Sequence, residues 1–301
     1  MNSMSLEAIA NETPPEALLP EVSQLRAAPA ARVLQRGHFE VFRTTREESP
    51  SLFRELCRQR EITFRLAGQG SGHALDVTTE DDWYEQLVLW DSQSEQLAGA
   101  YRLGNTATVI PERGIAGLYL AHMFDFEEEF FVRDHCALEL TRSFVGKDYQ
   151  NDRLALPLLW QGLGVMVQRL QVTRMFGSVT LSADFSEESR AAMVSWLTRY
   201  RRHQPAPLAR ALVKFPDETS PGWDPSRSID ELRESIVDHE GKPKPIPPLL
   251  RHYLKLGASF HDFHIEASFG DAVYCLLEVE MAGMPSTHRA KFIPTEEKKL
   301  S

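Results

Sequence analysis

The feature that most constrains the fold is a nine-residue segment, Ala137 to Val145, whose apolar pattern is typical of a buried strand. Glu139 and Arg142 lie inside this segment. A charge in a core strand is costly unless it is paired, solvated in a cleft or used by a ligand. On an unbroken strand two residues three apart face opposite sides, whereas a bulge between them would bring both to one cleft. The spacing is compatible with a structural ion pair and with a functional site alike.

The sequence after this strand predicts a binding position for an anion. Residues 146–152 form a polar loop, and residues 154–169 then have the pattern of an amphipathic or largely buried helix. Backbone amides at the N-terminus of a helix, together with the helix dipole, can hold an anionic group. The junction of the loop and the helix is therefore a position that can hold an anionic cofactor.

Composition restricts the class of protein. The 301 residues are 42% hydrophobic and 25% charged, which is ordinary for a soluble globular protein of one large domain or two small ones. No apolar stretch approaches a membrane-spanning length, and the acidic start of the chain lacks the features of a secretory signal. The three cysteines are far apart and lack metal-ligand spacing, which predicts reduced thiols in the cytoplasm and no metal site.

The charge pattern bears on partners. A net charge of -10 argues against binding of nucleic acid. Two stretches are basic although the chain as a whole is acidic. One lies within residues 26–36, and the other contains Arg199, Arg201, Arg202, Arg210 and Lys214. Such stretches are usually solvated helix faces, but they could dock an acidic carrier protein or the anionic headgroups at the inner face of the cell membrane.

Periodicity and turn residues predict the order of the elements. Strands are expected at residues 38–44, 85–91, 96–103, 137–145, 174–182, 259–267 and 272–281, and helices at 50–64, 154–169, 186–199 and 248–256. The glycine-rich residues 66–79 are expected to form a mobile loop. This mixture predicts an α/β (α+β) fold with one central mixed, largely antiparallel sheet that helices flank.

Local composition along the chain predicts its domain organisation. Residues 1–36 are rich in Ala, Pro and Glu, and we expect a flexible or weakly helical extension there. One domain is expected over residues 37–285, with a long excursion at 216–247 and a C-terminal tail at 286–301.

Four segments carry a resemblance to a known family. They are Leu52 to Phe64, Asp82 to Asp91 with Leu97 to Gly104, Glu139 to Val145, and Leu158 to Gly164 with Phe176 to Ser182. The motifs Gly-x-x-Arg-Leu, Glu-x-Thr-Arg and Leu-Leu-Trp-x-Gly follow one another in this order. With them the chain resembles the GNAT superfamily. More narrowly, it resembles the long-chain N-acyltransferases that make ornithine lipids and related acyl-amino acids, to which the acyl-homoserine lactone synthases are related.

The resemblance, which spans residues 38–215 and more weakly 248–281, implies a reaction. A long acyl chain, with or without a 3-hydroxyl group, would move from acyl carrier protein to the α-amine of an amino acid, with ornithine the favoured acceptor and glycine the next. The donor would be the acyl-phosphopantetheine of the carrier, with no cofactor bound to the enzyme. Acyl-CoA is less favoured, because residues 151–156 lack the glycines that CoA-dependent members use to bind the pyrophosphate.

The chemistry of N-acylation assigns roles to two carboxylates. An α-amine is mostly protonated at neutral pH, so a carboxylate, or water bound to one, must remove a proton before the amine can attack a thioester. Glu139 is the predicted acceptor of that proton, through water. Asp82 could share the task or hold the ammonium group, although a role as an ordinary cap explains it nearly as well. Asp76 and Asp81 fit the acidic position of the family less well.

Two arginines and a stretch of backbone complete the predicted site. Arg102 and Arg142 could hold the carboxylate of the acceptor or the phosphate of the donor, or could pair with Glu139 and other acids. The oxyanion is expected to meet a backbone amide of Ser143, Phe144 or Val145.

Other functions are compatible with the same residues. One is a signal synthase of the acyl-homoserine lactone type that acylates another amine, and another is a GNAT-like module without catalysis that binds acyl carrier protein or a lipid. Zinc is not expected, because His261 and His264 would face opposite sides of a strand. Cys136 has no identified histidine partner and is a poor candidate for a nucleophile.

Overall fold

A computed structural model describes residues 6–132, 136–200, 207–216, 226, 228–267 and 271–293. Contacts divide the chain into two compact units. Unit 1 comprises Met1–Val109, Leu138–Val172 and Ser286–Ser301, and unit 2 comprises Ile110–Ala137 and Thr173–Pro285. Parts of the expected excursion and of the expected tail, residues 217–225, 227 and 294–301, lie outside the described residues.

Unit 1 is built on an antiparallel sheet. Its strands follow the order β1 (Arg32–Arg36), β2 (Phe39–Thr44), β3 (Glu85–Asp91), β4 (Gln96–Asn105) and β6 (Ala137–Val145). Each neighbouring pair is antiparallel. The turn between β3 and β4 is stabilised by Asp91, whose Oδ1 accepts hydrogen bonds from the amides of Gln93 at 2.9 Å and Ser94 at 3.3 Å. A short polar side chain that bonds the backbone two or three residues on is a common device in tight turns.

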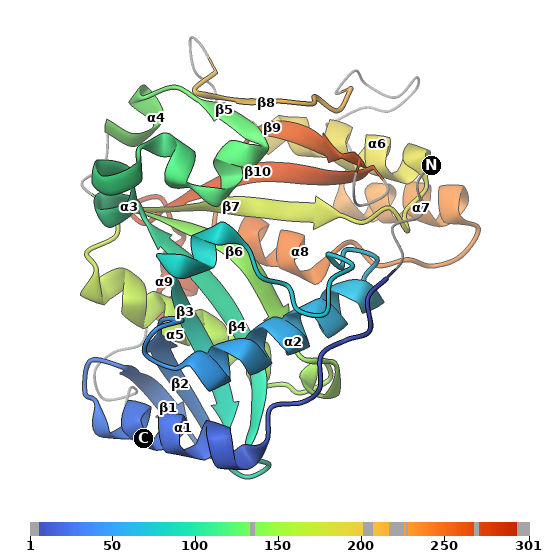
Figure 1. The fold of residues 1–301 in the computed structure, drawn as a ribbon. Coiled ribbons are helices and arrows are strands. Elements are labelled where there is room, and N and C mark those ends of the chain that lie inside the picture. The colour runs from blue at the N-terminus through green and yellow to red at the C-terminus, as the bar shows by residue number, and fades with distance from the viewer. Residues whose placement is uncertain are drawn as a thin grey trace. The chain divides into compact units, whose positions relative to one another are not determined.

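Helices cover both faces of this sheet. They are α1 (Pro15–Ala27), α2 (Pro50–Leu66), α5 (Ala155–Arg169) and α9 (Ser286–Phe292), and α3 (Thr106–Arg113) follows β4. α1 and α2 pack with Phe42, Val88 and Ala100 in one buried cluster. α5 instead meets the neighbouring positions Val41 and Leu87. Because successive residues of a strand point to opposite faces, α2 and α5 lie on opposite sides of the sheet (Figure 1).

A glycine lets α5 approach the sheet closely. A Cβ atom at Gly162 would lie 2.7 Å from Cγ1 of Val41. That distance is too short for two carbon atoms, so a larger residue at this position would push the helix away from β2. The glycine of the Leu-Leu-Trp-x-Gly motif therefore has a packing role.

The N-terminal region differs from its prediction. Residues 15–36, expected as part of a flexible or weakly helical extension, form α1 and β1. Leu18, Val22 and Leu25 recur at helical spacing and are buried in the cluster with α2. The flexible alternative is therefore wrong for this part, while the helical one holds for residues 15–27, because Leu18, Val22 and Leu25 lie on one face and are buried.

The glycine-rich loop is also more constrained than predicted. The carboxylate of Glu61 accepts hydrogen bonds from the amide of Ser71 at 2.9 Å, its hydroxyl at 2.8 Å and the amide of Gly72 at 3.0 Å. Arg65 donates to the carbonyl of His73 at 2.7 Å. Side chains of α2 thus hold the backbone of a segment that the sequence suggested was mobile.

Unit 2 contains a second antiparallel arrangement. Its strands β7 (Arg174–Leu181), β10 (Ala272–Glu280) and β9 (Ser259–Glu266) lie in this order, and β5 (Phe124–Phe126) pairs with β8 (Ala209–Ala211). Its helices are α4 (Glu129–Val132), α6 (Glu187–Leu197), α7 (Ile229–Glu240) and α8 (Pro248–Lys255). α6 and α7 pack side by side (Figure 1).

Helix α7 was missed in the sequence. It lies where an irregular excursion was expected, and it begins with a capping box in which the side chains of Ser228 and Glu231 each bond the backbone of the other residue. The motif Ser-x-x-Glu before an apolar pattern indicates the start of a helix, and residues 228–236 contain that signal.

The predicted fold class is confirmed. Helices flank a large, largely antiparallel sheet, as expected for an α/β (α+β) protein. Among the described residues, no helix combines the length and apolar character that a membrane span requires.

Candidate active site

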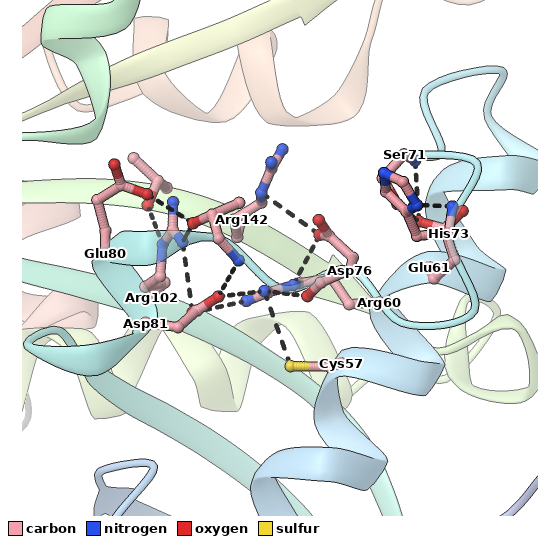
Figure 2. Close-up of polar contacts among 12 residues, drawn as sticks. Cys57, Arg60, Glu61, Ser71, His73, Asp76, Glu80, Asp81, Arg102 and Arg142 are labelled. Atoms are coloured by element: carbon pink, nitrogen blue, oxygen red, sulfur yellow. Dashed lines mark hydrogen bonds and ion pairs between the residues drawn. The ribbon is translucent and has the colours of Figure 1, made fainter. Parts of the chain in front are cut away.

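Unit 1 contains a buried group of arginine and aspartate side chains (Figure 2). We call it the arginine–aspartate cluster, and its members are Arg60, Asp76, Asp81, Arg102 and Arg142. Nε of Arg60 lies 2.8 Å from Oδ2 of Asp76, and Nη2 lies 2.9 Å from Oδ2 of Asp81. Arg60 and Arg102 are wholly buried, at 0% exposure. Charges this deep require partners, and here they partner one another.

A capping box turns Asp81 into the cluster. Thr78 precedes the 3₁₀ turn Thr79–Asp82, and its side chain bonds the amide of Asp81 while the carboxylate of Asp81 accepts a bond of 2.9 Å from the amide of Thr78. Nη1 of Arg102 lies 3.3 Å from Oδ1 of Asp81 and donates to the Thr78 hydroxyl at 2.5 Å. The local turn therefore determines which aspartate faces inward.

A bulge in β6 changes the direction of Arg142. Arg102 pairs with Thr141 and Ala100 pairs with Phe144, so the single residue between them on β4 faces two residues of β6. Arg142 has φ +50°, a backbone conformation uncommon for a residue with a side chain. Its Nε lies 3.3 Å from Oδ2 of Asp76. The bulge that the spacing of Glu139 and Arg142 would require is present, and it joins Arg142 to the cluster.

Glu139 is connected to the cluster through an aromatic side chain. The hydroxyl of Tyr84 donates to Oε2 of Glu139, and the guanidinium of Arg102 lies over the Tyr84 ring, 5.4 Å from its centroid. Gly104 pairs with Glu139 in the register, and a Cβ atom at Gly104 would lie 2.4 Å from the Tyr84 ring. Only a glycine allows the ring to lie there. Glu139 itself has 0% exposure.

The electrostatics of the cluster favour the charged forms of Asp81 and Arg60. Burial alone would raise the pKa of Asp81, but the guanidinium groups of Arg60 and Arg102 outweigh it and lower the pKa to about 2. Burial alone would lower the pKa of Arg60, but Asp76 and Asp81 raise it instead. Asp81 and Arg60 are therefore fixed charges at neutral pH.

Arg142 lies at the edge of this network. Its side chain is 11% exposed, whereas those of Arg60 and Arg102 are fully buried. Figure 2 shows the end of its guanidinium turned away from Asp76. Ser143 and Val145, which follow it, are partly exposed, and Phe144 is buried in the apolar cluster with α2. The roles predicted for these four residues stay predictions.

Asp82 lies elsewhere. Its side chain is 56% exposed, and its Oδ1 is 2.6 Å from Nη1 of Arg46. The structure therefore brings Glu139, Arg102 and Arg142 into one network but not Asp82, whose catalytic role stays a prediction. Asp76 and Asp81, which the sequence disfavoured, are the aspartates in that network. The Thr78-x-x-Asp81 spacing, which resembles a capping box, was the available signal for Asp81.

The expected anion position at α5 contains a carboxylate of the protein itself. Oδ1 of Asp152 accepts hydrogen bonds from the amides of Leu154 at 2.6 Å and Ala155 at 3.1 Å. The preceding loop is tied down by Tyr149, whose hydroxyl donates to Oδ2 of Asp91 at 2.9 Å. The first amides of the helix are therefore occupied in this conformation.

The contrast between two adjacent aspartates gives a prediction. Replacing Asp82 by Asn removes one exposed ion pair, so we expect the free energy of unfolding to change by less than about 1 kcal/mol. Urea denaturation monitored by circular dichroism measures this change. In the same preparation, a loss of turnover of more than about tenfold would support the proton-transfer role of Asp82. Unchanged turnover would remove Asp82 from the site.

Several known proteins are similar to this chain. A family model described as "Acetyltransferase (GNAT) domain" matches residues 59–161, which include the whole cluster and Glu139. A glycine Nα-acyltransferase of Bacteroides thetaiotaomicron is 30% identical over 261 residues, which cover 80% of this chain and 77% of that enzyme. These matches and the fold define the chain as a GNAT-domain acyltransferase.

Further relatives narrow the class. A glycine Nα-acyltransferase of Phocaeicola vulgatus is 35% identical over 183 residues, and the match spans little more than half, 56%, of each chain. An L-ornithine Nα-acyltransferase of Brucella abortus is 26% identical over 223 residues, 68% of this chain and 70% of that enzyme. The chain belongs to this family of amino acid Nα-acyltransferases.

A solved structure, that of a CoA-dependent acyl-homoserine lactone synthase, covers 87% of this chain and 98% of its own. It shares 11% sequence identity with this chain at a TM-score of 0.39. So loose a likeness supports no conclusion about the donor.

Proposed function

We propose that the protein transfers a long acyl chain from acyl carrier protein to the α-amine of an amino acid. The observation that carries this proposal is the 30% identity with a glycine Nα-acyltransferase over 77% of that enzyme. The chemistry also fits the residues: Glu139 and Arg142, which the family motif joins in one strand, belong to one connected network of contacts.

The identity of the acceptor amino acid can be ranked from the relatives. Relatives named for glycine are 35% and 30% identical to this chain, and those named for ornithine are each 26% identical. We therefore rank glycine first among the acceptors to test and ornithine, which the sequence motifs favoured, second. Arg142 at the edge of the cluster would bind the α-carboxylate that both acceptors share.

In the proposed reaction the amine attacks the thioester carbonyl carbon directly. One proton of the ammonium group passes through water to Glu139. An amide of Ser143 to Val145 stabilises the oxyanion, and the carbon–sulfur bond then breaks. The second proton, released as the amide forms, goes to the departing thiolate. The products are an N-acyl amino acid and a free carrier thiol, so no cofactor is consumed.

The role proposed here for Arg102 differs from the substrate-binding role that was expected from the sequence. It is wholly buried and bonds Asp81, Thr78 and Thr141, the last at 2.9 Å. We therefore propose that it positions Tyr84 and the turn around Asp81 rather than contacting substrate.

The proposed donor is the acyl-phosphopantetheine of the carrier rather than acyl-CoA. Asp152 already accepts from the amides of Leu154 and Ala155. Its charge would repel the two phosphates of a CoA pyrophosphate more strongly than the single phosphate of the carrier arm. Because both substrates are cytoplasmic, we place the enzyme in the cytoplasm, with peripheral contact at the membrane where its acylated product partitions.

A direct assay tests the function. Purified protein is incubated with acyl carrier protein that bears an isotope-labelled long acyl chain, and with glycine, ornithine or a panel of other amines. We expect an N-acyl amino acid, detected by its mass shift. A product only with an amine other than an amino acid would indicate a signal synthase instead. Tight binding of the carrier with no product would indicate a binding module without catalysis.

A further inference from the structure

A segment of unit 2 carries positive charge without any acidic residue. Residues 241–261 contain no Asp or Glu, although the whole chain has 43 acidic residues against 33 basic ones. Helix α8 (Pro248–Lys255) lies within this segment. Arg251 and Lys255 are one helical turn apart and share a face, while Leu250 and Tyr253 are buried. We call Arg251 and Lys255 the α8 basic pair.

The α8 basic pair makes no ion pair with any acid in the described part of the chain. Nε of Arg251 is buried and has no hydrogen-bond partner there. That nitrogen is out of reach of a surface partner, but Arg251 as a whole is partly exposed and Lys255 is exposed, so the positive charge of the pair is available at the surface.

The basic stretch that stood out in the sequence is used differently. Nη1 of Arg210 lies 2.6 Å from Oε1 of Glu127, so this arginine already has an acidic partner. Arg199 lies over the rings of Trp196 and Tyr200, 5.2 Å from each centroid. Arg201 and Arg202 lie outside the described residues. The contacts therefore favour α8 over residues 199–214 as the docking surface for an anionic partner.

The burial of α8 distinguishes between two kinds of partner. An amphipathic helix that binds a lipid surface inserts its apolar face into the membrane. The apolar face of α8 is instead packed inside unit 2, and none of the exposed large hydrophobic residues lies on this helix. The exposed large hydrophobic side chain that membrane insertion needs is absent from the described α8, whereas its basic side chains suit the carboxylates of an acidic protein.

We infer that the α8 basic pair docks an acidic carrier domain by charge complementarity. On the proposed function, on which this inference rests, that domain is the acyl carrier protein that delivers the chain. Complementary charge of this kind mainly accelerates encounter and sets register, so docking should be sensitive to salt.

The test reverses both charges in the full-length protein, Arg251→Glu with Lys255→Glu. Binding of fluorescently labelled holo acyl carrier protein is measured by anisotropy at low salt, and turnover is measured with the acylated carrier and with acyl-pantetheine, a donor without a protein. We expect Kd and KM for the carrier to rise about tenfold or more, and KM for acyl-pantetheine to stay within about twofold. Added salt should weaken carrier binding in the wild type more than in the variant.

Two matched variants control for other effects. Arg199→Glu with Arg210→Glu changes the net charge equally and should leave carrier binding within about twofold of the wild type. Arg251→Gln with Lys255→Gln should give an intermediate weakening, and its melting temperature shows that the fold is retained.

Three outcomes would overturn the inference. They are unchanged carrier binding, an equal loss with both donors, and a loss confined to sedimentation with phosphatidylglycerol vesicles, which would make the partner a lipid. Because carrier binding is measured without turnover, the proposed function can fail separately. Binding that depends on the α8 basic pair, but without any acyl transfer, would contradict the enzyme and retain the docking surface.

Discussion

Glu139→Gln should reduce kcat by about 10²–10⁴-fold, because glutamine keeps the shape of the side chain but cannot accept a proton from the acceptor amine. Glu139 is buried, with 0% exposure, and accepts a hydrogen bond from Tyr84. The amide oxygen of glutamine can accept that bond as well, so the fold should be retained. Steady-state kinetics with acylated carrier and amino acid measure the effect.

Two controls separate chemistry from folding in this experiment. Urea denaturation of Glu139→Gln should show a loss of no more than about 1–3 kcal/mol, the cost of one imperfectly bonded buried amide. Tyr84→Phe removes the hydroxyl that bonds Glu139 but leaves the carboxylate, so it should reduce kcat less than Glu139→Gln does. Wild-type turnover by a folded Glu139→Gln protein would show that Glu139 is a structural residue.

Asp81→Asn should produce the largest loss of stability in the cluster. The substitution removes a carboxylate that pairs with Arg60 at 2.9 Å and with Arg102 at 3.3 Å, and leaves both guanidinium groups buried without it. Breaking a buried pair from one side costs about 3–5 kcal/mol of unfolding free energy. Asp82→Asn, one residue away, is the matched control. Equal stability of the two variants in urea would contradict the cluster as described.

The same carboxylate gives a pH dependence. The pKa of Asp81 falls from an ordinary 3.8 to about 2 in the folded protein. A lowered pKa means that the folded state holds the ionised form, so its stabilisation is complete above about pH 4 and is lost as the pH falls toward 2. The wild type should lose roughly 2 kcal/mol from this group over that range. Asp81→Asn should lack that component in denaturation curves recorded at successive pH values.

Local patterns explain what could be predicted. The alternation in residues 137–145 predicted β6. The spacing of Glu139 and Arg142 suggested a bulge as one possibility, and the strand register contains that bulge. The hairpin of β3 and β4 followed from two apolar runs around a polar turn. These features depend on neighbours in sequence, where periodicity and turn chemistry apply.

Pairing over long distances explains what could not be predicted. Arg60 meets Asp76 and Asp81, sixteen and twenty-one residues further on, and no local pattern marks such a pair. Asp81 and Asp82 are identical in type, and only the direction that the 3₁₀ turn imposes separates a buried carboxylate from an exposed one. Residues 15–27 were expected to be flexible or weakly helical, and their packing was not predicted because the apolar face of α1 is narrow and is buried only against α2.

On the proposed function, the position of Asp152 would make donor choice a competition within the molecule. A phosphate that binds at the start of α5 must displace the carboxylate of Asp152. Because that carboxylate is part of the same chain, its effective concentration at the helix start is high and does not depend on the concentration of the protein. Selectivity between donors can therefore arise from competition with a carboxylate of the protein itself rather than from a steric clash or a missing contact. A single neutral replacement at this position would release two backbone donors, which offers a simple route to re-engineer the range of thioesters that the enzyme accepts.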